Sequence, residues 1–375
     1  MERYDFIVVG AGIAGASAGF ALSADARVLL IERESQPGYH STGRSAALYV
    51  QTHGPAVVRT ITRASKSFFM NPPDGFAEGP LLTPRGIMFI GRADQSDQLE
   101  RCIEESARTV GAVRRITGPQ AHAMVPVLRE DYVAGAVLDP EAMDIDVHAV
   151  HYGYLRGLRS RGGAIVTAAE LHGLDYRDGV WTASTAAGEF SAPVIVNAAG
   201  AWCDKVAALA GARAVGLVPK RRTAFIFDPP ALADIREWPS IHDVGETFYF
   251  KPDAGRILAS PADETPMEPS DVQPDDLDVA IAAERIQAAA LLPIRHIIRR
   301  WAGLRSFVAD GVPVVGYDPA VAGFFWLAGQ GGYGIETSPT MGRLCASLAT
   351  GRGIPPDLAD LGVEERLLSP SRFAT

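Results

Sequence analysis

The sequence contains few cysteines and lysines and no long hydrophobic run. Its three cysteines, Cys102, Cys203 and Cys345, lie far apart and show no CxxC spacing, which argues against a disulfide framework and against a metal site. A reducing compartment therefore fits best. No apolar stretch approaches the roughly 20 residues that span a bilayer, and the first apolar strand begins so early that no room is left for a signal peptide. We expect a cytoplasmic protein without a transmembrane segment, or one attached peripherally to the inner face of the membrane.

Positive charge is also scarce. The chain has 35 Lys and Arg against 44 Asp and Glu, a net charge of −9, which argues against nucleic acid as a partner. Apolar residues are abundant, because 47% of the 375 residues are hydrophobic, enough for a large core. The length predicts two domains, or one large α/β unit with an insertion.

The most informative segment runs from residue 4 to residue 32. It reads as an apolar strand, a turn with Gly10, Gly12 and Gly15, a helix of small residues and a second apolar strand that ends at Glu32. The first glycine allows a tight turn, the second lets a pyrophosphate approach the backbone, and the third lets the helix pack on the sheet. The helix N-terminus favours phosphate, and the glutamate can accept hydrogen bonds from ribose hydroxyls. This pattern predicts a bound dinucleotide.

Further turns favour FAD over NAD. Another apolar strand, later in the chain, ends in Asn-Ala-Ala-Gly at 197–200. A hydroxyl-rich segment spans 38–47, and a glycine cluster at 331–337 precedes a predicted helix. FAD is long and needs several backbone turns along its length. The last cluster can place N–H groups and a helix dipole near the flavin pyrimidine.

The order of these segments predicts a discontinuous cofactor domain. We assign residues 1–85, 145–217 and 301–375 to an FAD-binding domain, and residues 86–144 and 218–300 to a substrate-binding domain. The first is expected to be a Rossmann-like α/β domain, and the second an α+β domain with an antiparallel or mixed sheet.

Six segments carry a family resemblance over nearly the whole chain. They are residues 37–47, 196–204, 219–227, 248–255, 301–311 and 330–335. The chain resembles the D-amino acid oxidase-like flavoproteins, and among these the D-arginine dehydrogenase branch of FAD-dependent D-amino acid dehydrogenases. The resemblance implies a glutathione reductase-type nucleotide fold and FAD bound without a covalent link. His40 raises the covalent alternative, because some relatives attach flavin through His or Cys.

The resemblance also implies a set of cofactor contacts. The residues expected to bind FAD are Gly10, Gly12, Ile13, Ala14, Gly15, Glu32, Arg33, Ser41, Thr42, Arg44, Ser45, Ala46, Ala47, Glu170, Ala199, Gly200, Trp202, Gly303, Gly331, Gly332, Tyr333, Gly334, Ile335 and Thr337.

Oxidation of an amino acid requires a clamp for its carboxylate, and an arginine fork suits that role. Arg222 begins a predicted strand and Arg305 lies in an apolar run. From the residues alone, Arg222 is interpreted equally well as a solvated strand end, and Arg305 as part of a structural ion pair, as either is as a clamp. The resemblance implies that both arginines and Tyr249 hold the carboxylate. It further implies that the backbone carbonyl of Gly332 meets the substrate amine.

Four positions depart from the D-arginine pattern. Leu48 replaces a histidine, His53 a tyrosine of the mobile lid, Ile87 the glutamate that pairs with guanidinium, and Glu336 a glutamine. Loss of the distal carboxylate disfavours a cationic substrate, whose charge would be desolvated without a partner. We therefore expect an apolar side chain on the substrate. His53 is interpreted as a gate, a base or a loop residue without a role.

The expected activity is oxidation of a D-amino acid to the imino acid by hydride transfer from Cα to flavin N5. Hydrolysis then yields a 2-oxo acid and ammonia. The alternatives are a secondary-amine oxidase of the sarcosine or glycine type, a 2-hydroxy-acid dehydrogenase, or a non-catalytic flavin subunit. Either O₂ or a quinone-type acceptor can reoxidise the flavin, and the sequence leaves the oligomeric state open.

Overall fold

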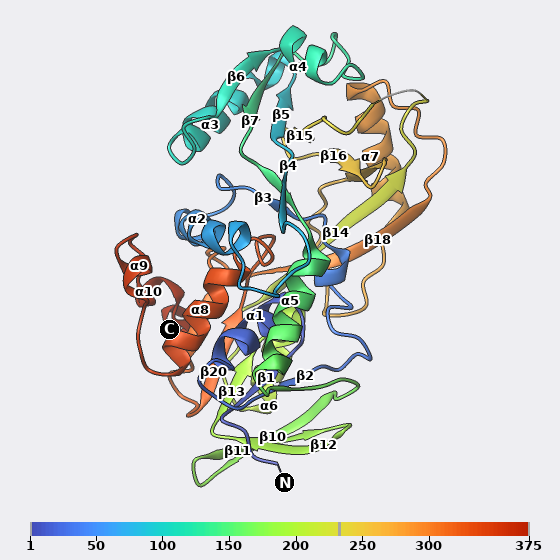
Figure 1. Ribbon diagram of the computed structural model, residues 1–375. Helices are drawn as coiled ribbons and strands as arrows, with labels where there is room; N and C mark the ends of the chain where they lie inside the picture. The colour runs from blue at the N-terminus through green and yellow to red at the C-terminus, as the bar shows by residue number, and fades with distance from the viewer. Residues whose placement is uncertain (1, 232–233, 374–375) are drawn as a thin grey trace.

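The computed structural model describes residues 2–231 and 234–373. Its lower part in Figure 1 is built on a six-stranded sheet in the order β19-β20-β13-β1-β2-β9. Neighbouring strands are parallel except for the antiparallel pair of β19 and β20. The strands are β1 (Phe6–Val9), β2 (Val28–Ile31), β9 (Ala164–Val166), β13 (Val194–Asn197), β19 (Val314–Tyr317) and β20 (Phe324–Ala328).

Both faces of this sheet are covered, which explains why its central strands are apolar throughout. In β1, Val8 packs in one core cluster and Ile7 in another on the opposite face. The first face carries α1 (Ile13–Leu22), α5 (Val147–Ser160) and α8 (Ser338–Ala349). The second carries α6 (Cys203–Leu209) and an antiparallel sheet of β10 (Leu171–Arg177), β11 (Val180–Thr185) and β12 (Gly188–Ala192).

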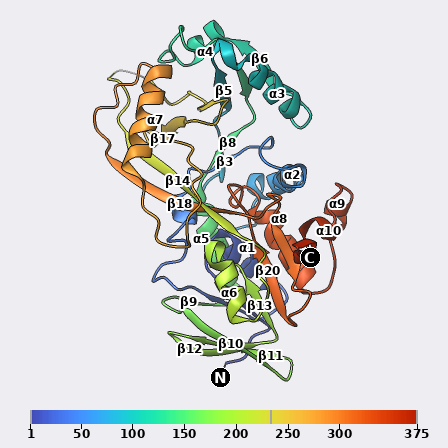
Figure 2. The ribbon, with the colours of Figure 1, turned by 180° about the vertical axis from the view of Figure 1, so that it is seen from behind.

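An eight-stranded sheet forms the second part, at the top of Figures 1 and 2. Its order is β18-β14-β17-β16-β15-β5-β7-β6, with β15 and β5 the parallel pair. The strands are β5 (Ile87–Gly91), β6 (Arg114–Thr117), β7 (Gly135–Asp139), β14 (Val218–Phe227), β15 (Ser240–Asp243), β16 (Tyr249–Asp253), β17 (Arg256–Ser260) and β18 (Arg299–Phe307). The helices α3 (Ser96–Ala107), α4 (Gly118–Met124) and α7 (Asp276–Ala289) accompany it.

The remaining elements connect or flank the two large sheets. A small antiparallel sheet joins β3 (Leu48–Tyr49), β8 (Met143–Ile145) and β4 (Leu82–Pro84). The remaining helices are α2 (Ala56–Met70), α9 (Pro356–Ala359) and α10 (Glu365–Leu368), and the short 3₁₀ turns are η1 (Thr42–Arg44), η2 (Ala93–Gln95), η3 (Gly200–Trp202) and η4 (Pro370–Phe373). Within the described ranges no helix is both long enough and apolar enough to cross a bilayer.

The strands of the six-stranded sheet come from three separate stretches of sequence, and those of the eight-stranded sheet come from the intervening stretches. The exact division into domains stays a prediction. Its boundary between residues 300 and 301 falls inside β18, which pairs along its length with β14. The last predicted segment of the cofactor domain thus begins within a strand of the other sheet.

Candidate functional site

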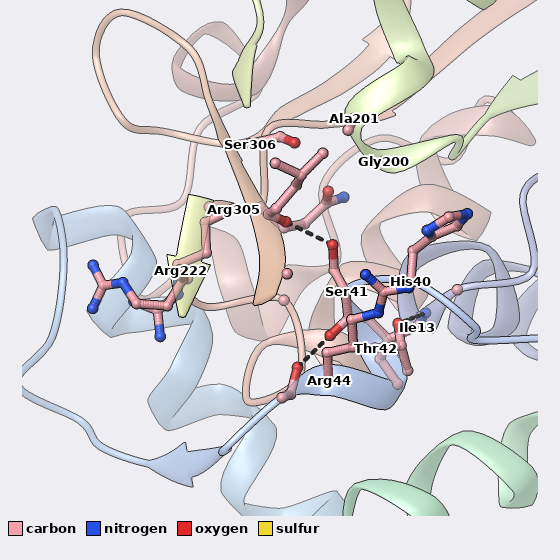
Figure 3. A pocket seen from close by; sticks show the side chains of 18 of the residues that line it. Ile13, His40, Ser41, Thr42, Arg44, Gly200, Ala201, Arg222, Arg305 and Ser306 are labelled. Carbon is pink, nitrogen blue, oxygen red and sulfur yellow. Dashed lines mark hydrogen bonds between the residues drawn. The ribbon is translucent and has the colours of Figure 1, made fainter. Parts of the chain in front are cut away.

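A cavity of about 600 Å³ lies between the two large sheets. Its walls include the carboxyl ends of β1, β2 and β13, the position at which open α/β sheets bind ligands. Other walls come from β14, β15, β16 and β18 of the second sheet. Figure 3 shows Ile13 and His40 on one side of the cavity and Arg222 on the other. We call these the nucleotide end and the substrate end.

The glycine turn at the nucleotide end has the geometry that a pyrophosphate needs. Gly10 has φ +98°, and a Cβ there would lie 2.7 Å from the carbonyl oxygen of Ala198. A Cβ on Gly15 would lie 1.8 Å from the carbonyl oxygen of Gly10, so these two glycines are required by backbone packing alone. Gly12 differs, because a Cβ there would meet only the Thr42 hydroxyl, at 3.3 Å. It lines the cavity, so its missing side chain keeps space open for a ligand.

Glu32 is held at the end of β2 by backbone N–H groups. One carboxylate oxygen accepts from Ala11 at 2.8 Å and the other from Glu34 at 3.0 Å. Burial raises the pKa of this carboxyl, and the two hydrogen bonds oppose the rise. Nearby, the Arg33 guanidinium lies 5.1 Å from the Trp202 ring. This combination of a fixed carboxylate and a flat apolar ring suits an adenosine group.

The hydroxyl-rich segment is tied to both sheets. The Thr42 hydroxyl accepts the Ile13 N–H at 3.0 Å, and the Ser41 hydroxyl donates to the carbonyl of Leu304 at 2.6 Å (Figure 3). Arg44 donates to the carbonyl of Ala302 at 3.0 Å. The segment is therefore fixed between the first helix of the nucleotide fold and β18.

His40 belongs to the nucleotide end. Its Nε2 lies 2.9 Å from a carboxylate oxygen of Glu34, and its ring lies 4.7 Å from that of Trp202. Its Nδ1 is buried without a hydrogen-bond partner in the described ranges. Figure 3 places it away from Arg222. This position agrees with the expectation of a non-covalent flavin.

Arg305 is the central feature of the substrate end. It is surrounded by protein and lines the cavity, yet its guanidinium makes no hydrogen bond or ion pair with any residue in the described ranges. Burial, and then the charge of Arg222, lower its pKa. Arg222 is already paired, because it donates to the carbonyl of Asp263 at 3.0 Å and to Glu264 at 2.9 Å. An unpaired buried cation is costly, so Arg305 is available to an anion that enters the cavity.

Two histidines line the same end. His242 on β15 stacks on Tyr249 of β16, with ring centroids 4.9 Å apart and an interplanar angle of 12°. Its Nε2 lies 2.9 Å from the Ser240 hydroxyl. His53, from the turn after β3, lies 6.4 Å from the His242 ring and 6.1 Å from that of Phe89. Burial lowers the pKa of His53 to about 4 and that of His242 well below its ordinary value, so both rings are neutral near pH 7.

Sequence reasoning identified His53 and Tyr249 but missed Ser240, His242 and Phe89. The available signal was the alternation of Ser240 and His242, which places both side chains on one face of a strand. The strand is only four residues long, which is too short for the alternation to identify it.

The structure places Ile87 behind the cavity wall. Its side chain is fully buried in a cluster with Val50 and Ala142, and it is not among the lining residues. Leu48, packed against the same cluster, and Phe89 do line the cavity. The expectation of an apolar pocket therefore loses one of its two supports.

The other predicted residues lie on or just behind the wall. Most of the predicted cofactor residues line the cavity, while Gly15 and Thr337 lie outside the lining. Thr337 is the N-cap of α8, directly after the glycine cluster. A Cβ on Gly332 would lie 3.0 Å from a guanidinium nitrogen of Arg305, so the cluster runs against the unpaired arginine.

Glu336 is buried in the cavity wall at 4% exposure. One carboxylate oxygen accepts the Val50 N–H at 2.8 Å. Burial raises its pKa to about 8, although the Val50 hydrogen bond and the charge of Arg305 oppose the rise. Glu336 is thus protonated near pH 7 and can donate a hydrogen bond, as a glutamine would.

Glu336→Gln should flatten the pH dependence of stability. Because the folded-state pKa of about 8 lies above the unfolded value of 4.5, the wild-type free energy of unfolding falls as pH rises from 4.5 through 8. The variant cannot lose that proton. Urea unfolding at pH 6 and pH 9, at equal FAD saturation, should show the variant gaining about 1–3 kcal/mol relative to wild type at the higher pH. An equal change in the free energy of unfolding between pH 6 and pH 9 in the two proteins would contradict the buried protonated carboxyl.

Comparisons with known proteins agree with this geometry. A family model described as FAD dependent oxidoreductase, DAO, matches residues 5–348. Glycine oxidase of Geobacillus kaustophilus (strain HTA426) is 24% identical over 98% of this chain and 98% of its own length. YurR of Bacillus subtilis (strain 168), an uncharacterized oxidoreductase, is 23% identical over 94% of this chain and 97% of its own length.

Solved structures establish the fold independently. The crystal structure of glycine oxidase from Geobacillus kaustophilus has a TM-score of 0.84 at 24% identity, over 96% of this chain and 98% of that one. L-proline dehydrogenase from P. horikoshii has a TM-score of 0.85 at 20% identity, over 100% of this chain and 98% of that one. These comparisons confirm the predicted fold class and FAD as the cofactor.

Proposed function

The chain belongs to the DAO family of FAD-dependent oxidoreductases, and on that premise we propose that it oxidises the CH–NH bond of a small amino acid whose carboxylate binds Arg305. When bound, FAD accepts the two electrons and the hydrogen removed from the substrate carbon. The protein's own contribution is to orient the substrate and to exclude water.

The observation that carries the proposal is the unpaired guanidinium of Arg305 in the cavity wall. A carboxylate would satisfy it with charge-assisted hydrogen bonds, for which the planar fork of arginine is suited. Tyr249 and the glycine cluster at Gly332 flank the same space and complete the proposed clamp. The carbonyl of Gly332 is the proposed partner of the substrate amine.

The names of the relatives support an amine substrate. Those with printed activities include glycine oxidase and dimethylglycine dehydrogenase. We propose a D-amino acid, with secondary amines as the second candidate. D-arginine itself should be a poor substrate, because its guanidinium would lose water at the substrate end, where Glu264 is already paired with Arg222.

A panel of substrates tests the proposal. Anaerobic loss of the visible flavin absorption is measured with D- and L-alanine, D- and L-aspartate, sarcosine and D-lactate, each against buffer alone. We expect at least one of the amino compounds to reduce the flavin at least tenfold faster than D-lactate. Faster reduction by the hydroxy acid would replace the CH–NH assignment with a CH–OH assignment. No reduction by any compound would favour a flavin subunit that relays electrons.

The acceptor and the location remain proposals as well. O₂ and a quinone analogue are the two acceptors to compare, by following reoxidation of the substrate-reduced enzyme after each is added. A cytoplasmic location, with or without peripheral attachment to the membrane, is the corresponding expectation.

A further inference from the structure

Two neutral histidines beside a carboxylate clamp need an explanation. His242 and His53 line the substrate end with ring centroids 6.4 Å apart. Stacking on Tyr249 and contact with the Ser240 hydroxyl hold the first ring in place. A cavity that received only an apolar side chain would gain nothing from two half-buried imidazoles in its wall, since that side chain would take water from their polar atoms without replacing its hydrogen bonds.

The polar atoms of these rings are open to a ligand. Among the described residues, Nδ1 of His242 and both ring nitrogens of His53 make no hydrogen bond. The rings of both residues can be reached from the cavity, because both residues form part of its lining. They can therefore donate to, or accept from, a group of the substrate.

The charges that act on the two rings are positive. Arg222 and Arg305 act on both, and Lys251 acts on His242 as well. Arg222 is paired with Glu264, and Lys251 is paired with Asp144 at 2.5 Å. That aspartate also binds Arg85 at 2.6 Å, so one carboxylate serves two cations there.

The remaining acidic groups of this wall are engaged or lie elsewhere. Asp243 is buried and accepts from Gln95 at 3.3 Å and from Thr247 at 2.7 Å. Glu246 lines the cavity and acts on the pKa of Tyr333, not on those of the two histidines. The charged side chains that shift the pKa values of both rings are nevertheless the cationic ones, Arg222 and Arg305.

We propose that His53 and His242 form a second anion subsite, with the buried Ser240 hydroxyl holding the His242 ring, so that the substrate is an amino acid with a second carboxylate. The inference deepens the proposed function and rests on it. One carboxylate binds Arg305, and the second is hydrogen-bonded by the histidines. This substrate differs from the one with an apolar side chain that was expected from sequence, because Ile87, one of the two residues that favoured it, does not line the cavity.

Binding of the second carboxylate should be coupled to proton uptake. A buried anion stabilises imidazolium, so a histidine that is neutral in the free protein gains a proton when the dianion binds. By linkage, the Kd of such a ligand rises about tenfold per pH unit for each proton taken up. A monocarboxylate lacks this coupling. Glu336 also titrates near pH 8, but it faces both kinds of ligand equally, so the difference between the two slopes reports the subsite.

The experiment uses carboxylates that carry no amine and cannot be oxidised as substrates. The FAD-loaded enzyme is titrated with malonate, succinate and glutarate, and with the matched monocarboxylates propionate, butyrate and valerate. Binding is read from the change in the flavin spectrum between pH 6 and pH 8. We expect the best dicarboxylate to bind at least tenfold more tightly at pH 7 than the matched monocarboxylate. The slope of log Kd against pH should be steeper for the dicarboxylate by about one.

Two variants locate the effect. His242→Phe keeps the ring that stacks on Tyr249 and removes the polar nitrogens. It should reduce the preference for the dicarboxylate at least tenfold and remove the extra slope, while changing monocarboxylate binding less than threefold. His296→Leu is the matched control, because His296 is exposed in the loop before β18 and lies outside the cavity lining. It should leave both ligands unchanged.

Each outcome is decisive. Equal binding and equal slopes for the two ligand series would overturn the second subsite and leave the Arg305 clamp standing. Failure of every carboxylate to perturb the flavin would overturn the clamp, and with it the proposed function. If His242→Phe does not fold, the wild-type affinity ratio and slopes still decide the question.

Discussion

Arg305→Met should reduce kcat/KM for the best amino acid substrate by about 30- to 5000-fold, because removal of one partner of a buried charge pair costs about 2–5 kcal/mol. Methionine keeps the length and the apolar contacts of the side chain while removing the charge. Steady-state kinetics on the FAD-loaded variant measure the loss. Most of it should appear in KM if the arginine holds substrate and transition state equally.

The same substitution should not destabilise the protein. Arg305 is half-buried and makes no hydrogen bond or ion pair in the described part of the chain. Its removal relieves a desolvated charge, so the free energy of unfolding without substrate should stay the same or rise. Lost stability together with lost activity would show that the arginine has a structural role. Unchanged kinetics would remove it from the clamp.

Gly12→Ala should weaken FAD binding while leaving the fold intact. The new methyl group would meet only the Thr42 hydroxyl, at 3.3 Å, but it would occupy cavity space beside the helix N-terminus. Such crowding typically costs about 1–3 kcal/mol, or about 5- to 150-fold in Kd. Titration of the apoprotein with FAD, followed by flavin fluorescence, measures the change.

A glycine remote from the cavity provides the control. Gly111 is exposed, and a Cβ there would have no neighbour within 4 Å. Gly111→Ala should bind FAD with wild-type affinity. If Gly12→Ala also binds normally, the pyrophosphate does not pass over this turn. If the apoprotein of Gly12→Ala unfolds, its effect is structural and the cofactor assignment at Gly12 loses its support.

The nucleotide end could be predicted from sequence because its chemistry is local. Gly10, Gly12, Gly15 and Glu32 lie within one βαβ unit, and short-range packing dictates their spacing. The structure adds the reason for each glycine, namely backbone approaches at two of them and open cavity space at the third.

The substrate end was harder to predict because it is assembled by long-range strand pairing. The parallel pairing of β15 with β5 sets Ser240 opposite Ile87 and His242 opposite Phe89. Residues about 150 positions apart in the sequence thus form one wall. Ile87 and Phe89 share one face of β5, but only Phe89 lines the cavity, so the position along the strand, which the register sets, decides which residue a ligand can meet.

The protonation of Glu336 could not be predicted from sequence either. Its position after the glycine cluster was evident from sequence, but its protonation follows from burial and from the Val50 N–H at 2.8 Å. Neither contact has a sequence signature. The boundary within β18 has a similar cause, because the strand pairs in the second sheet while Ala302 and Leu304 inside it accept hydrogen bonds from the hydroxyl-rich segment.

The proposed oxidation of a CH–NH bond is tested most directly by the products formed per flavin reduced. The FAD-loaded enzyme is reduced anaerobically with a limiting amount of its best amino acid substrate, and the released nitrogen compound and the carbonyl product are then assayed. We expect one equivalent of 2-oxo acid and one of ammonia per equivalent of flavin reduced, or one of carbonyl compound and one of amine when the substrate is a secondary amine. Reduction of the flavin without release of ammonia or an amine would contradict the proposal.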